Sequence, residues 1–361
     1  MLRYIGHFML TLPRAYTAES VTSGHPDKIC DQISDAMLDA YLTQDKNSRV
    51  AIECFGGHGH LVIGGEVTTR GSVNAESIAR QVYAGIGYRE PLSITTHIVR
   101  QSPDIAQGVD TGGAGDQGIM YGYATNETPE FLPRATVFAH KLSAGLENLR
   151  RNDPTFFWLR PDGKTQVTIV DDVITAIVVS TQHEKTCEWK SMRDEIKKKL
   201  VDEVCVDEDI SGVRFLFNPT GIFVQGGFEA DTGLTGRKIM VDTYGGIIPH
   251  GGGAFSGKDA TKVDRSAAYM CRLVAKSLVA NKKAKQCLVS VAYAIGEAEP
   301  VMIEAINENG KSLADIVKEK FDFKPHAIIE RLGLRRPIFQ KTATYGHFGK
   351  AGLPWEEIVE L

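Results

Sequence analysis

The sequence repeats one order of elements three times, and this repeat limits the folds that the chain can adopt. In each copy a loop rich in Gly and Asp leads into an amphipathic helix, and two strands, a second helix and another strand follow. The three loops are Ser23–Lys28 (SGHPDK), Gly112–Gly118 (GGAGDQG) and Gly251–Asp259 (GGGAFSGKD). A unit that recurs in one order predicts several similar domains rather than a chance alternation of helices and strands.

Apolar residues at helical spacing mark the helix that follows each loop. In the first copy Ile29, Ile33, Met37 and Tyr41 share one face of the helix. The first helices of the second and third copies are predicted at 133–150 and 262–281. The second helices of the three copies are predicted at 75–88, at 191–204 and from 312 onward.

Strands are predicted where runs rich in Val, Ile and aromatic residues lie between turn residues. In the three copies these runs are 49–55, 60–69 and 93–101, then 164–170, 173–182 and 213–227, then 287–296, 300–307 and 337–345. A further strand is predicted at 238–244, just before the third glycine loop.

Each copy would form a mixed or antiparallel sheet covered by helices, so the predicted fold class is α+β with three similar domains. The sequence regions are 16–104, 112–229 and 230–361, after an N-terminal extension of residues 1–15. Strand 173–182 is apolar on both faces. Because helices cover only one face of each sheet, we expect a subunit interface on the other.

Composition excludes several classes of protein. The net charge of −4 provides no basic field for nucleic acid. No stretch is long and apolar enough to span a membrane, and residues 1–15 do not read as a signal peptide. The six cysteines include no C-x-x-C pair, so we expect reduced thiols in a cytoplasmic protein and no zinc or redox motif.

The third loop contains G-x-x-x-x-G-K from Gly252, as a P-loop does. A P-loop follows a strand directly and has Ser or Thr after the lysine, whereas here GGIIPH intervenes and Asp259 follows Lys258. A P-loop is therefore rejected. Glycine N–H groups and the next helix start still suit an anion. Taken alone, an anion site and a turn with solvated lysines are equally supported.

The second loop contains a formal G-x-G-x-x-G from Gly113 to Gly118. A dinucleotide fingerprint must follow a strand and open a helix. The following sequence, with Gly122 and Pro129, does not support a helix, so a Rossmann site is rejected. Asp116 and Gln117 remain candidate polar contacts in a loop.

Candidate cations gather in glycine loops and at helix starts, which suits a polyphosphate ligand. They are His25, Lys164, Arg237, Lys238, Lys258 and Lys262. Asp27 and Asp264 are acids at helix starts, and Mg²⁺ often takes only one or two carboxylates beside phosphate and water. No motif assembles an activated nucleophile. A neutral nucleophile and a polyphosphate leaving group would need none, only charge stabilisation and alignment.

The chain resembles the methionine adenosyltransferase (S-adenosylmethionine synthetase) family. The matching blocks run in the family's order from about Tyr16 to Trp355 and include GHPDK, GAGDQG, LRPDGKTQ, GLTGRK, GGGAFSGKD and KVDRSAAY. The resemblance implies three α+β domains in a pseudo-threefold arrangement, interleaved in sequence. It implies formation of S-adenosylmethionine from ATP and L-methionine, by sulfur attack on C5′ with triphosphate as leaving group, and then triphosphate hydrolysis to pyrophosphate and phosphate.

The same resemblance implies roles for individual residues. The catalytic residues would be His25, Lys164, Arg237 and Lys258. ATP would contact these four residues and Asp162, Phe223, Asp231, Lys238 and Ala254. Methionine would contact Glu66, Gln101, Asp116, Asp231 and Lys262. Two Mg²⁺ per site would be held by Asp27 and Asp264, and one K⁺ per subunit by Glu53. The family's active sites lie between subunits, so a homodimer or a dimer-of-dimers tetramer is expected.

The chain departs from the family pattern at a few places. Ile222 precedes Phe223 where a basic residue is frequent in the family. The segment before QSPDI is short, as is VDTGGAGDQ after a predicted lid at 101–111, and the chain ends soon after PWEE. These departures bear on the lid and on assembly, and none of them removes a charged residue of the predicted site.

Two other functions use the same cations. A phosphotransferase would move the γ-phosphoryl group, but no dedicated acceptor-activating pair is visible. A nucleotide-binding regulatory subunit would lack the reaction. The products discriminate, because a kinase releases ADP whereas the predicted reaction releases pyrophosphate and phosphate.

Overall fold

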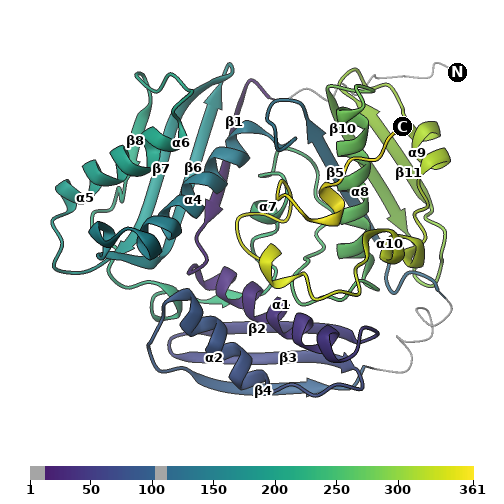
Figure 1. Cartoon of the computed structure of the whole chain (residues 1–361), viewed down its shortest axis with the longest axis horizontal. Coiled ribbons are helices and arrows are strands. Elements are labelled where there is room, and N and C mark those ends of the chain that lie inside the picture. Colours follow the sequence, from purple (N-terminus) through teal and green to yellow (C-terminus); the bar gives the residue numbers. More distant parts are fainter. Residues whose placement is uncertain (1–12, 102–111) are drawn as a thin grey trace, which may run out of the picture.

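The computed structural model describes residues 13–101 and 112–361, which form three β-sheets with helices packed against them (Figure 1). The sheets lie at the corners of a triangle, with α7 (Ile239–Asp242) and the C-terminal segment between them (Figure 1). The α+β fold class with three similar units is confirmed.

The first sheet, in spatial order, consists of β4 (Ser93–Val99), β3 (His60–Thr68), β2 (Arg49–Gly57) and β9 (Gly233–Leu234). Helices α1 (Pro26–Gln44) and α2 (Ala75–Ile86) cover one of its faces (Figure 1). The predicted apolar face of α1 is its buried face, where Ile29, Ile33 and Met37 are fully buried.

The second sheet consists of β1 (Ala15–Val21), β6 (Leu159–Val170), β7 (Val173–His183) and β8 (Arg214–Phe217). Its helices are α4 (Arg134–Asn152), α5 (Trp189–Ile196) and α6 (Asp202–Val204), and a π-helical turn (Lys197–Val201) joins the last two. A 3-10 turn at Pro154–Phe156 leads from α4 into β6. The predicted helix at 191–204 is thus confirmed as one helical segment with a π turn inside it.

The third sheet consists of β11 (Met302–Asn307), β10 (Gln286–Tyr293) and β5 (Gly118–Thr125). Its helices are α8 (Val263–Ala280), α9 (Ala314–Lys320) and α10 (Pro325–Leu332). β5 directly follows the second glycine loop, so the rejection of a Rossmann helix at that place is confirmed.

The three sheets share one plan, which explains why the sequence repeats. Each is centred on an antiparallel hairpin, β2–β3, β6–β7 or β10–β11. A strand from elsewhere in the chain pairs antiparallel with the first hairpin strand: β9 with β2, β1 with β6, and β5 with β10. In two sheets a last strand, β4 or β8, runs parallel to the second hairpin strand. The sheets are therefore interleaved in the sequence, while the linear boundaries 16–104, 112–229 and 230–361 stay predictions.

Two predicted strands are wrong. The segment 238–244 contains the short helix α7, because the N–H of Asp242 closes a helical turn on the carbonyl of Lys238 at 2.9 Å. The segment 337–345 contains a 3-10 turn at Gln340–Thr342. Its backbone is held by the carboxylate of Asp39, which accepts the N–H groups of Phe339 and Gln340.

The helices that carry the predicted site share a buried core. Arg265 of α8 and Asp35 of α1 are both 0% exposed and form a bidentate ion pair with N–O distances of 2.6 and 2.9 Å. Gly122 of β5 lets α8 come close, because a Cβ there would lie 2.1 Å from the carbonyl carbon of Cys271. The ion pair fixes the start of α8 relative to α1, and the glycine lets the middle of α8 pack on β5.

Two further predictions concern covalent links and membranes. All six cysteines lie in the described part of the chain and are free thiols. In residues 13–101 and 112–361, no helix combines the length and the apolar character that crossing a membrane requires.

Candidate active site

His25 occupies the N-cap of α1, with Pro26 in the first turn. Its Nδ1 accepts the N–H of Asp27 at 3.2 Å. Burial, and then the nearby charges of Lys238 and Lys164, lower the pKa of His25 to about 2. The imidazole is therefore neutral with its proton on Nε2, which leaves Nε2–H as a hydrogen-bond donor.

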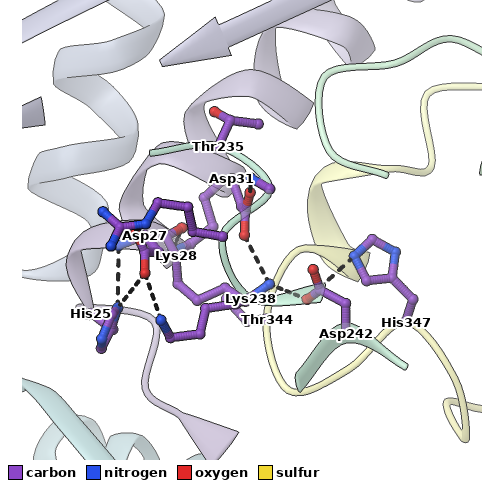
Figure 2. Close-up of polar contacts among 12 residues, drawn as sticks. His25, Asp27, Lys28, Asp31, Thr235, Lys238, Asp242, Thr344 and His347 are labelled. Atoms are coloured by element: carbon purple, nitrogen blue, oxygen red, sulfur yellow. Dashed lines mark hydrogen bonds and ion pairs between the residues drawn. The ribbon is translucent and has the colours of Figure 1, made fainter. Parts of the chain in front are cut away.

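The carboxylate of Asp27 joins α1 to β9 and to the segment that follows it, which carries Lys238 (Figure 2). Oδ1 accepts the N–H of Leu234 at 3.0 Å, and Oδ2 accepts a hydrogen bond from Nζ of Lys238 at 2.6 Å. Nε of Arg237 lies 3.8 Å from Oδ1. Helix α1 and the predicted phosphate cations thus meet at one carboxylate.

Strand β6 brings Asp162 and Lys164 to the same place. Lys164 pairs in register with Val21, just before the His25 loop, and its side chain is exposed. Asp162 is 5% exposed, and its Oδ2 accepts the N–H of Gly227 at 2.8 Å. Its Oδ1 is buried and has no hydrogen-bond partner among the described residues. Burial raises the pKa of Asp162 to about 6.

Phe223 and Asp231 flank this group. The backbone of Phe223 makes two hydrogen bonds with His183 at the end of β7: its N–H donates to the ring Nε2 at 3.1 Å, and its carbonyl accepts the backbone N–H of His183 at 2.9 Å. Asp231 is exposed, and its charge contributes to the raised pKa of Asp162. We call this set, with His25, Asp27, Asp162, Lys164, Arg237 and Lys238, the first group.

A second group surrounds the third glycine loop. Nζ of Lys258 lies 2.7 Å from Oδ2 of Asp264, which is in the first turn of α8. Lys262 pairs with Asp259. Gly253 is required here, because a Cβ would lie 2.3 Å from Oδ1 of Asp264. The loop follows α7 and a further turn rather than a strand, so the rejection of a P-loop is confirmed.

The second group extends onto the outer face of the first sheet. The loop lies against β2, where Ala51 bridges to Lys258 and the N–H of Asp259 donates to the carbonyl of Val50 at 3.0 Å. Glu53 of β2 and Glu66 of β3 are exposed on the face of this sheet that the helices do not cover.

The two groups approach each other at one point. A Cβ on Gly236 would lie 2.5 Å from the Cβ of Ala254, so the glycine loop passes beside the segment that carries Arg237. Within the described residues, no hydrogen bond or ion pair joins a charged member of one group to the other.

The remaining predicted residues lie near the second group or at its margin. Asp116 is exposed, and its loop ends at Gly118, beside Asp264.

Gln101 is half-buried at the edge of the described chain. The predicted lid at 101–111 lies outside the described residues except for Gln101.

Three charged residues that lie buried beside the first group were not assigned a role from the sequence: Lys28, Asp31 and Asp242. Lys28 forms ion pairs with both acids (Figure 2). The local signal was weak, because Lys28, Asp31 and Asp35 lie on the face of α1 opposite Ile29, Ile33 and Met37, where charged residues are usually solvated. Only Leu38 and Leu42 on that same face indicate burial. The partner Asp242 is 214 positions from Lys28 and carries no such signal.

The donor sets fit hard cations that share their ligands with phosphate. In the described residues, no cluster of three His, Cys, Asp or Glu side chains forms a protein-only metal cage. Asp27 and Asp264 each present one carboxylate beside lysines, which matches the one or two carboxylates that Mg²⁺ takes in phosphate sites. Glu53 offers a single exposed carboxylate, so a K⁺ site there needs further oxygens.

Comparison with known proteins identifies the family. Three S-adenosylmethionine synthetase models match: the N-terminal domain at residues 13–105, the central domain at 111–223 and the C-terminal domain at 225–357. The S-adenosylmethionine synthase of Mesoplasma florum is 49% identical over 368 residues, covering 96% of this chain and 97% of the relative. That of Salinibacter ruber is 47% identical over 374 residues, covering 96% of each. The chain therefore belongs to the S-adenosylmethionine synthetase family, the methionine adenosyltransferases.

Proposed function

We propose that the chain forms S-adenosylmethionine from ATP and L-methionine and then hydrolyses the triphosphate to pyrophosphate and phosphate. The observation that carries the mechanism is the first group, in which a buried neutral imidazole stands among Lys164, Arg237 and Lys238. This arrangement stabilises developing negative charge, and burial lowers the pKa of the imidazole so far that it is a weak base. It suits a reaction in which no proton has to be removed from the nucleophile.

The adenosyl transfer balances without an acid–base pair. A lone pair of the methionine sulfur forms the bond to C5′, and the C5′–O bond breaks with its electrons moving to the triphosphate oxygen. Nε2–H of His25 donates to that oxygen as its charge grows. Lys164, Arg237 and Lys258 neutralise the phosphates, with Lys238 beside them. Water then cleaves the triphosphate to pyrophosphate and phosphate.

Metal ions complete the charge balance. Asp27 and Asp264 would each hold one Mg²⁺, which supplies positive charge to the phosphate oxygens when bound. Glu53 would hold one K⁺ per subunit. In each proposed Mg²⁺ site a lysine already contacts the carboxylate, so the ammonium and the metal compete for it.

The remaining predicted residues would bind the organic parts of the substrates. Phe223 would stack on adenine, and Asp162, Asp231 and Ala254 would contact ATP. Methionine carries both charges, so Glu66, Asp116 and Asp231 suit its ammonium and Lys262 its carboxylate. Gln101 would lie at the methionine side of the site.

We further propose a homodimer, or a tetramer of two dimers, with active sites between subunits. Glu53 and Glu66 share the uncovered face of the first sheet with Phe55, Val62 and Val99, which are 54%, 42% and 45% exposed. An apolar face of this kind favours association. Pairing two such faces would place the second group of one subunit against the first group of the other.

A product assay tests the proposal. The chain is incubated with ATP, methionine and Mg²⁺, and products are identified by mass spectrometry and phosphate analysis. We expect S-adenosylmethionine, pyrophosphate and phosphate in equal amounts. Formation of ADP with no S-adenosylmethionine would instead establish a phosphotransferase, and ATP binding without turnover would establish a regulatory subunit.

A further inference from the structure

A buried ion triad lies next to the first group (Figure 2). Nζ of Lys28 is 3.0 Å from Oδ2 of Asp31 and also contacts Oδ1 of Asp242. Lys28 and Asp31 are 0% exposed and Asp242 is 2% exposed. The reaction proposed above assigns no role to these three residues. Because apolar residues of similar size would pack without the cost of desolvating ions, such a triad requires another explanation.

The triad holds both ends of the segment 236–242, which carries the proposed phosphate-binding residues Arg237 and Lys238. We call this segment the clamp segment. Before Arg237 and Lys238, the N–H of Gly236 donates to Oδ1 of Asp31 at 2.8 Å. After them, α7 starts, and its last residue is Asp242. Arg237 and Lys238 therefore lie in a short segment whose two ends both contact the same helix, α1.

On α1, Lys28 directly follows Asp27, and Asp31 lies about one turn after Asp27. His25 is the N-cap, and its carbonyl accepts the N–H of Ile29 at 2.9 Å, so the first turn of α1 is regular. Lys28 and Asp31 then project from that turn and the next one. The triad thereby sets the distance from His25 and Asp27 to the clamp segment.

A second link between these segments is expected to break during the reaction. Lys238 contacts Asp27 at 2.6 Å, but a metal ion on Asp27 and a phosphate at Lys238 would separate the two side chains. Among the contacts that remain, the hydroxyl pair of Ser34 and Thr235 at 2.8 Å holds only the side that precedes Arg237. The triad adds an attachment on both sides of Arg237 and Lys238, and its three members are at most 2% exposed.

We propose that Lys28, Asp31 and Asp242 are positioning residues that keep Arg237 and Lys238 in register with His25 and Asp27 while those side chains exchange partners. The inference rests on the proposed function, since it concerns Arg237 and Lys238, which are proposed to bind the triphosphate. A misplacement of about 1 Å can lower a rate about a hundredfold, so a small shift of the clamp segment should lower the reaction rate measurably.

The test compares two replacements of Asp31 in the full chain. Asp31→Asn keeps an oxygen for the N–H of Gly236, whereas Asp31→Leu removes it. We expect Asp31→Leu to lower kcat about a hundredfold and Asp31→Asn to recover much of that loss. KM for methionine should change little. Binding of inorganic tripolyphosphate, measured by calorimetry, should weaken in the same order as kcat falls.

A triple variant and a matched control keep the test decisive. Lys28→Met with Asp31→Asn and Asp242→Asn leaves no unpaired buried charge, so it should fold, with weakened tripolyphosphate binding. Glu356→Gln disrupts another buried ion pair, with Arg272 of α8, and should lower thermal stability without changing kcat. If the triad variants behave like Glu356→Gln, the triad is only structural and the proposal is wrong. A wild-type chain that binds tripolyphosphate but makes no S-adenosylmethionine would refute the proposed function alone.

Discussion

Nζ of Lys238 lies 2.6 Å from Oδ2 of Asp27, although 211 positions separate the two residues in the sequence. Lys258 and Asp264 form a second pair of the same kind, with an N–O distance of 2.7 Å. Each pair joins a predicted phosphate-binding lysine to a predicted Mg²⁺ ligand. We propose that a metal ion on either carboxylate competes with the ammonium, which then pairs with the triphosphate.

This partner exchange predicts cooperative binding of Mg²⁺ and polyphosphate. Mg²⁺ alone should bind weakly, and tripolyphosphate should raise its affinity by a factor of about 5 to 150, the usual range of coupling between sites. By linkage, Mg²⁺ must raise the affinity for tripolyphosphate by the same factor. Calorimetric titrations in both orders measure the two factors. Equal Mg²⁺ affinity with and without tripolyphosphate would contradict the exchange.

Lys238→Met separates two effects of the Lys238 ammonium: its competition with Mg²⁺ for Asp27 and its attraction for phosphate. It removes the ammonium that competes for Asp27, so Mg²⁺ alone should bind this variant more tightly than the wild type. The same variant should bind tripolyphosphate more weakly and lose part of the coupling. Lys276→Met is the control, because Lys276 pairs with Glu356, a residue of neither site group. Its Mg²⁺ and tripolyphosphate affinities should match those of the wild type.

His25→Ala should lower kcat by about a hundredfold or more, because it removes a donor to charge that grows in the transition state. Its effect on methionine binding should be small. Lys258→Ala should behave in the same way. Single-turnover measurements with saturating substrates give the rate of the chemical step, and a near wild-type rate in either variant would show that the assigned role is wrong.

The protonation state of His25 gives a separate pH prediction. A folded-state pKa of about 2, below the ordinary 6.5, means that the folded chain disfavours the imidazolium. The stability that the neutral ring contributes is present above pH 6.5 and is lost as the pH falls toward 2. Nitrogen-15 spectra of labelled histidine should show a neutral ring with its proton on Nε2 at pH 6. An imidazolium signal from His25 at that pH would contradict the assignment.

Asp162 should reduce stability at neutral pH. Burial raises its pKa from 3.8 to about 6, so the stabilising state is the protonated one. That contribution is fully present below pH 3.8 and is lost as the pH rises through 6, which corresponds to about 3 kcal/mol. Asp162→Asn keeps an acceptor for Gly227. The variant should match the wild type at pH 4 and be more stable at pH 8.

Denaturant unfolding at a fixed protein concentration measures this trend. Asp209→Asn is a control for the direction of this pH dependence. Hydrogen bonds from Ser211 lower the pKa of the exposed Asp209 carboxyl, so the stability difference from the wild type should change with pH in the opposite direction. A stability difference between Asp162→Asn and the wild type that stays constant from pH 4 to 8 would refute the buried-carboxyl assignment.

Phe55→Glu tests the subunit interface. Phe55 is 54% exposed on the uncovered face of the first sheet, and Val62 is its cross-strand partner. A carboxylate in this apolar interface should produce monomers in sedimentation experiments, and activity should fall because the two site groups no longer meet. Phe157→Glu, at a residue that is 75% exposed outside the first sheet, should leave assembly unchanged. An active monomer would refute both the interface and the shared site.

The sequence predicts those parts of the fold that local patterns specify. Apolar spacing identified α1, α4 and α8, and the runs of β-branched residues identified the hairpins. The interleaving strands were missed for a physical reason: β9 has only two residues, Gly233 and Leu234, and its pairing depends on β2 far away in the sequence. The apolar run Ile239–Val241 suggested a strand, but the backbone turn and the buried side chain of Asp242 decide for a helix.

The site was predictable where loop chemistry carries the signal. His25, Asp27, Lys238 and Lys258 stand in glycine loops or at helix starts, and the structure places them in two groups. The pairing of each lysine with a carboxylate was not predictable, since Asp27 and Lys238 meet only because β9 pairs with β2 of the first sheet, far away in the sequence. Lys28 and Asp242 were missed for the same reason.

The fate of the C5′ oxygen tests the central claim most directly. ATP labelled with oxygen-18 between C5′ and the α-phosphorus is turned over with methionine and Mg²⁺, and the products are separated and weighed by mass spectrometry. If the sulfur attacks C5′ and triphosphate leaves, all of the label appears in the inorganic phosphate products. Label retained in a nucleoside or nucleotide product would mean that a P–O bond breaks instead, and this would contradict the account.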